Sequence, residues 1–120
     1  MSQQPATIPS IEVAEAESRA RGGAVIVDVR EIAEFVQARV PGAALVPMSA
    51  FATRYEELPK DRPLLVMCAS GNRSQAAAAH LLRNGWTDVV NVTGGIVAWE
   101  KAGLPVSHGP VTPGEGDLPG

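Results

Sequence analysis

Two runs of apolar residues constrain the fold of this chain more than any other feature. Residues 24–29 and 63–68 are almost continuously apolar, and Asp28 is the one charged residue within them. Short runs of this kind are typical of strands that are buried on both faces of a parallel sheet. Residues 88–92 form a third candidate strand.

Helical segments are expected between these strands. Ser10 is a suitable N-cap for a helix that ends at Gly22-Gly23, because its side chain accepts hydrogen bonds from the first turn. The other expected helices are residues 31–39, 73–84 and 96–102, and residues 43–46 are a short strand candidate. Strands that alternate with helices at this spacing predict an α/β fold in which helices cover both faces of a mostly parallel sheet.

The 120 residues suffice for one domain, expected over residues 8–106. Residues 1–7 are polar and contain a proline, and residues 107–120 are rich in glycine and proline. Neither segment carries enough apolar side chains to stay ordered alone, so we predict a flexible N-terminal segment and a flexible C-terminal tail.

Charge and composition exclude several classes of partner. Ten Lys plus Arg stand against thirteen Asp plus Glu, and only five residues are aromatic. Nucleic acids and anionic membranes are therefore not expected as partners, because the chain lacks both the basic excess and the aromatic platforms that bind nucleic acid. The sequence shows neither a signal peptide nor a run of apolar residues long enough to span a membrane.

The chain has one cysteine, Cys68, so it forms no internal disulfide. With only His80 and His108 beside it, a Cys/His zinc site is not expected. A lone thiol either packs in the core without reacting or is a reactive group. A reducing cytoplasm is the location in which a free thiol stays reduced.

The position of Cys68 favours a reactive role for its thiol. It ends a predicted central strand, and Ala69, Ser70, Gly71, Asn72 and Arg73 connect it directly to a predicted helix. Ligands of open α/β sheets bind at this edge. A short glycine-containing loop at a helix N-terminus turns backbone N–H groups inward, where they would cradle an anion and lower the pKa of the thiol.

Several motifs of this chain resemble those of the rhodanese-like sulfurtransferase family. They are residues 27–30 with Glu34-Phe35, residues 40–43, the loop 68–74, residues 94–99 and residues 102–106, and they follow the family's order and spacing. The resemblance implies a rhodanese-like three-layer α/β/α domain and the activity of a thiosulfate sulfurtransferase.

The activity implied by this resemblance has two steps. The Cys68 thiolate takes sulfur from thiosulfate or a similar persulfide donor and becomes a persulfide, which passes the sulfur to cyanide or to a thiol acceptor, including a protein thiol. No metal or organic cofactor is implied. The alternative is a non-catalytic binding or sulfur-sensing module with the same fold; the intact Cys68, Gly71 and Arg73 favour the enzyme.

The length of the loop separates this family from cysteine-dependent phosphatases of similar fold. Four residues lie between Cys68 and Arg73, one fewer than in those phosphatases, and no general acid is evident nearby, so phosphatase activity is not expected. Arg73 is expected to bind an anionic sulfonyl group with its guanidinium fork or to hold the loop.

The remaining candidates have supporting roles. The resemblance implies that Asp28 and Arg30 brace the loop through ion pairs and hydrogen bonds, and it adds Ser74 as a supporting residue. Gly94-Gly95 is expected to let backbone approach the loop closely. Neither His80 nor His108 is expected to act as a base for Cys68.

Overall fold

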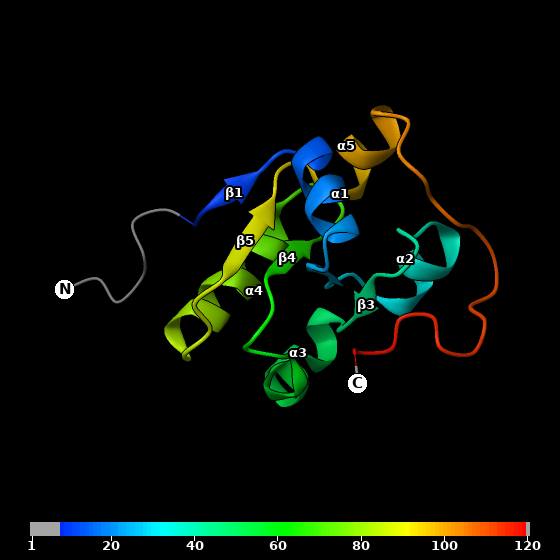
Figure 1. The fold of residues 1–120 in the computed structure, drawn as a ribbon. Coiled ribbons are helices and arrows are strands. Elements are labelled where there is room, and N and C mark those ends of the chain that lie inside the picture. The colour runs from blue at the N-terminus through cyan, green and yellow to red at the C-terminus, as the bar shows by residue number, and fades with distance from the viewer. Residues whose placement is uncertain (1–7, 120) are drawn as a thin grey trace.

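The computed structural model describes residues 8–119, and its centre is a sheet of parallel strands in the order β1-β5-β4-β2-β3 (Figure 1). The strands are β1 (Ser10–Ile11), β2 (Val25–Asp28), β3 (Ala44–Leu45), β4 (Leu64–Met67) and β5 (Val89–Val92). The helices are α1 (Val13–Arg21), α2 (Ile32–Gln37), α3 (Met48–Arg54), α4 (Asn72–Arg83) and α5 (Gly95–Lys101), with a 3₁₀ turn, η1 (Tyr55–Glu57), after α3. The expected α/β architecture is confirmed.

Side chains alternate between two cores along each central strand. In β2 and β4, Val27 and Val66 belong to the core that α3 and α4 cover, whereas Ile26 and Leu65 belong to the core that α1, α2 and α5 cover. All residues of both strands are buried. This explains why the two strands are continuous apolar runs rather than alternating ones.

The structure differs from the expected helix at the N-terminal end. Ser10 does not cap a helix but lies in edge strand β1, opposite Asn91 of β5. The backbone N–H groups of Asn91 and Thr93 donate to the carbonyls of Pro9 and Ile11, at 2.8 Å each. The sheet thus uses the polar groups of this segment, and Glu12 takes the N-cap position of α1 without a side-chain cap.

The described part of the C-terminal tail also differs from expectation, because residues 107–119 run along α2 and end beside β3 (Figure 1). The buried side chain of Arg39 donates to the carbonyls of Gly109 and Pro110 and forms an ion pair with Glu115 at 2.9 Å. Leu45 N–H then donates to the carbonyl of Gly116. These polar contacts, together with Val111 and Leu118 packing against the two cores, attach the tail to the domain. The segment 1–7, expected to be flexible, lies outside the described residues.

Within residues 8–119, no helix is both long and apolar enough to cross a membrane.

Candidate active site

Cys68 lies at the carboxyl end of β4, in the middle of the sheet, and its side chain is buried. The loop that follows reaches α4 through Gly71, whose φ of 114° lies in the left-handed region that favours glycine. Gly71 is the N-cap residue of α4. The loop therefore turns back over the thiol immediately before the helix begins.

Hydrogen bonds from this turn converge on the sulfur. The backbone N–H of Gly71 donates to Cys68 Sγ at 3.0 Å, and Ser74 Oγ lies 3.3 Å from the same atom. Burial acts to raise the pKa of the thiol, but hydrogen bonds from the Ser74 side chain and from the backbone of Ser74, Gly71 and Ser70 outweigh it and hold the pKa below its usual value. The loop thus favours a thiolate at Cys68.

The start of α5 packs against the other side of the loop. Ile96 N–H donates to the carbonyl of Cys68 at 2.9 Å, and Val97 N–H donates to that of Ala69 at 3.1 Å. A Cβ atom on Gly95 would lie only 2.2 Å from the Cys68 carbonyl oxygen. The expected close approach of backbone at this glycine pair is confirmed, and it gives two loop carbonyls hydrogen-bond donors from α5.

The guanidinium fork of Arg73 binds a carboxylate of the protein itself. Its two terminal nitrogens donate to Glu34 Oε1 and Oε2 at 2.8 and 2.9 Å. This pairing holds the pKa of Glu34 at about 2 and raises that of Arg73 above its ordinary value. Of the two roles considered for Arg73, the geometry therefore favours holding the loop, because the fork is already occupied.

The sequence analysis included Glu34 in a family motif but gave it no role in the site. It lies in the first turn of α2, where Oε1 also accepts the backbone N–H of Glu31 in a reciprocal capping box. The usual sequence signature of such a box has serine or threonine at the N-cap, whereas this chain has glutamate. The motif therefore gave no indication that Glu34 would reach α4.

Asp28 and Arg30 form a buried ion pair at the end of β2. Arg30 Nη2 lies 2.7 Å from Asp28 Oδ2, and Arg30 Nε donates to both carboxylate oxygens. The same guanidinium donates to the backbone carbonyls of Glu34 and Ala38. The pair thus attaches α2 to the sheet and holds the helix that carries Glu34, which is a physical basis for the expected bracing role.

The other loop residues form the rim of the site. Ser70 and Asn72 are exposed, and Ala69 is half-buried. The structure therefore brings together Cys68 and Ser74 at the centre of the loop, with these three residues around them.

The two histidines lie elsewhere. His80 packs edge-on against Tyr55, with 4.4 Å between ring centroids, and His108 Nδ1 is 2.8 Å from the carbonyl of Gln37. Neither has a hydrogen bond to Cys68 among those found over residues 8–119. In the same part of the chain, no three His, Cys, Asp or Glu side chains cluster in a way that could hold a metal ion.

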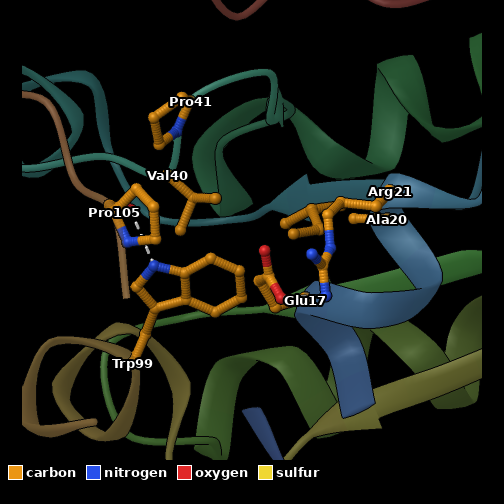
Figure 2. A pocket seen from close by; sticks show the side chains of 8 residues that line it. Glu17, Ala20, Arg21, Val40, Pro41, Trp99 and Pro105 are labelled. Carbon is orange, nitrogen blue, oxygen red and sulfur yellow. Dashed lines mark hydrogen bonds and ion pairs between the residues drawn. The ribbon is translucent and has the colours of Figure 1, made fainter. Parts of the chain in front are cut away.

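A cavity of about 200 Å³ lies between α1, α5 and the sheet, outside the Cys68 loop. Figure 2 shows the Trp99 ring at its wall, with the indole N–H bonded to the carbonyl of Pro105 and Glu17 near Arg21 on the opposite side. These polar groups are already paired, including the Glu17 carboxylate with Arg21, and the lining contains no thiol, hydroxyl or histidine side chain. The loop is therefore the better candidate site.

Several known proteins are similar to this chain in sequence and in fold. A sulfurtransferase from Allochromatium vinosum is 43% identical over 82 residues, which cover 68% of this chain and 77% of that protein. The thiosulfate sulfurtransferase GlpE of Pseudomonas syringae is 38% identical over 85 residues, 71% of this chain and 80% of the relative. The crystal structure of a rhodanese-related protein from Thermoplasma volcanium matches with a TM-score of 0.78 at 32% identity, covering 82% of this chain and 97% of that one.

The family description that matches is the rhodanese-like domain, and it spans residues 12–102. This range contains strands β2 to β5, the Cys68 loop and the start of α5 that packs on it. The chain belongs to the rhodanese-like domain family.

Proposed function

We propose that this protein is a sulfurtransferase that carries sulfur as a persulfide on Cys68. The observation that carries this proposal is the convergence of hydrogen bonds on Sγ at the turn of the loop, which lowers the pKa of the thiol from its usual value. Sulfurtransferase relatives that are 38% and 43% identical to the chain support the same class of reaction.

The first step loads sulfur onto the enzyme. The Cys68 thiolate attacks the outer sulfur of thiosulfate, a new S–S bond forms to Sγ, and the old S–S bond breaks so that its electron pair leaves with sulfite. The product is a Cys68 persulfide anion. A low-molecular-weight persulfide would donate in the same way, with a thiolate as the leaving group.

The second step returns the enzyme to its starting state. Cyanide attacks the terminal sulfur of the persulfide, the S–S bond breaks, and thiocyanate leaves while Cys68 recovers its thiolate. A thiol acceptor, including a protein cysteine, would take the sulfur through its own thiolate and become the persulfide. Each step passes a sulfur atom from one nucleophile to another and balances without an external oxidant or reductant, so neither calls for a metal or organic cofactor.

The loop would stabilise charge in both steps. Backbone N–H groups that face Sγ, such as that of Gly71, are rigid donors aimed where negative charge resides. Removing one such donor in other enzymes slows the reaction by roughly 10²–10³. Because a free thiolate must stay reduced between cycles, we propose the reducing cytoplasm as the place of action.

The decisive experiment is an intact mass measurement of the reduced protein before and after incubation with thiosulfate, and again after cyanide. We expect a gain of one sulfur atom that cyanide removes. Cys68→Ser is the matched control, since the alcohol is a far weaker nucleophile at neutral pH, and its circular dichroism should equal that of the wild type.

A sulfur adduct on Cys68→Ser would contradict the assignment. No adduct on the wild type with thiosulfate or with glutathione persulfide would instead favour the alternative, a rhodanese-fold module that binds or senses a ligand without turnover.

A further inference from the structure

A chain of buried polar side chains leads away from Cys68 beneath the loop. Ser74 Oγ lies 3.3 Å from Cys68 Sγ and 2.5 Å from Asn91 Oδ1. Asn91 Nδ2 donates to Ser10 Oγ at 3.4 Å, and Ser10 Oγ donates to the carbonyl of Ile8. The first three side chains are at most 2% exposed, whereas Ser10 is exposed on the edge strand.

The sheet register explains why these groups meet. Asn91 of β5 lies between Val66 of β4 and Ser10 of β1, so its side chain points toward α4, on the face where Val66 packs. Ser74 lies in the first turn of α4 on the same face. A buried amide among apolar residues is costly unless its hydrogen bonds are made, and here the two serines make them.

The number of protons on these side chains fixes the direction of the hydrogen bonds between them. A serine hydroxyl has one proton, and Ser74 gives it to Asn91 Oδ1. It therefore has no proton left for Cys68, and a favourable contact with Sγ requires the thiol to donate its own proton to Ser74 Oγ. The direction of the Ser74–Asn91 bond alone thus suits a protonated Cys68, whereas the backbone N–H of Gly71 donates to Sγ and favours the thiolate.

A thiolate requires the opposite direction. The sulfur then only accepts, so the Ser74 hydroxyl must turn toward it, which leaves Asn91 Oδ1 without a donor. Exchanging the two ends of the amide restores the buried bonds: Asn91 Nδ2 donates to Ser74 Oγ, and Ser10 donates to Asn91 Oδ1. The Ser10 proton then leaves the carbonyl of Ile8, at the exposed edge strand where water can donate instead. The two ends of an amide have nearly the same shape, so this exchange needs no change in packing.

We propose that Asn91 is a positioning residue whose amide reverses when Cys68 loses its proton, so that Ser74 donates to the thiolate. The inference rests on the proposed use of Cys68 as a thiolate, and it adds a residue that does not touch the substrate.

The charged groups facing this region come from α4, α2 and β2. Arg73 of α4 interacts electrostatically with both Cys68 and Asp28, and it is paired with Glu34 of α2, while Asp28 of β2 is paired with Arg30. With its pKa at about 2, Glu34 keeps its charge throughout the range in which a thiol titrates. Loss of the Cys68 proton to water is then the event that reverses these hydrogen bonds.

The test follows the side-chain NH₂ signals of Asn91 by NMR while Cys68 is titrated in the full-length protein. We expect these signals to shift with a midpoint equal to the Cys68 pKa that is measured from the pH dependence of iodoacetamide alkylation. In Cys68→Ser the shift should disappear. Asn91 signals that stay constant through the titration of Cys68 in the wild type would overturn the proposal.

A variant adds a second readout. Asn91→Asp keeps the shape of the side chain but has no N–H to give, so it locks the Ser74 hydroxyl away from the sulfur. We expect the Cys68 pKa to rise by about one unit or more, with about tenfold less thiolate at neutral pH. Because a buried carboxylate also raises this pKa by its charge, Asn91→Leu is measured beside it: it is uncharged and leaves the Ser74 hydroxyl free for the sulfur, so the Cys68 pKa should not rise. Asn84→Asp is the matched control, because Asn84 bonds to the carbonyl of His80 at the far end of α4.

An Asn91→Asp protein that folds with the wild-type Cys68 pKa would also overturn the proposal. If that variant does not fold, the NMR titration of the wild type decides alone. None of these measurements uses a sulfur donor. A failure to form a persulfide would therefore contradict the proposed function and leave the Asn91 result standing.

Discussion

Replacing Glu34 with glutamine tests whether α2 and the active loop are held together by the Arg73 fork. The substitution keeps the size of the side chain but removes its charge, so Arg73 loses an ion pair that it now makes through two hydrogen bonds of 2.8 and 2.9 Å. One amide oxygen remains to accept a single bond. We expect a measurable loss of stability together with a change in its pH dependence.

The magnitude follows from the geometry and exposure of the pair. The Arg73 and Glu34 side chains are 37% and 35% exposed, so water screens much of their attraction. Exposed pairs typically contribute 0.2–1 kcal/mol, and a two-pronged geometry lies at the upper end. We therefore expect Glu34→Gln to lower the free energy of unfolding by about 1 kcal/mol at neutral pH.

The pH dependence has a definite sign. The pKa of Glu34 is held at about 2 in the folded protein, below its ordinary value of 4.5, so the folded state favours the charged form. The stabilisation is therefore complete above pH 4.5 and is lost as the pH falls toward 2. The difference between the wild type and Glu34→Gln should shrink over this range.

Urea unfolding of both proteins at a series of pH values measures this difference. Glu15→Gln is the matched control, because Glu15 pairs with Arg19 within the exposed face of α1, and its loss should cost less than about 0.5 kcal/mol. The reasoning is refuted if Glu34→Gln is as stable as the wild type at neutral pH, or if its deficit is independent of pH.

Two further predictions concern the contacts around the loop and the tail. Gly95→Ala should lower the free energy of unfolding by about 3 kcal/mol, since the new Cβ would lie 2.2 Å from the carbonyl oxygen of Cys68 and φ is positive there. Gly103→Ala is the control for the effect of φ alone, because Gly103 has a positive φ with open space around it. An equal loss of stability in both variants would contradict the clash. Glu115→Gln should weaken the attachment of the tail to Arg39 and raise the hydrogen-exchange rate of the Leu45 amide about tenfold, without changing persulfide formation; an unchanged exchange rate would mean that the tail is held by its backbone contacts alone.

Much of the fold was predictable from local sequence patterns. The apolar runs that form β2 and β4 can be predicted as buried strands without knowing their neighbours in the sheet, because their composition already excludes an exposed face. The turn at Gly71, which ends the Cys68 loop, was equally predictable, since few residues other than glycine adopt its left-handed conformation. By contrast, Ser10 and Asn91 carry no such signal, and their positions depend on strand pairing.

The sequence by itself determined the class of fold, the place of Cys68 at the end of a central strand and the loop that turns over it, because each of these depends on residues that are close along the chain. Only the tertiary structure decided which groups the polar side chains would meet. Arg73 lies 39 positions from Glu34, Ser74 lies 17 from Asn91, and Arg39 lies 76 from Glu115. A hydrogen bond is fixed by angles and distances of a few ångströms, and packing of the helices on the sheet sets these only once the chain has folded.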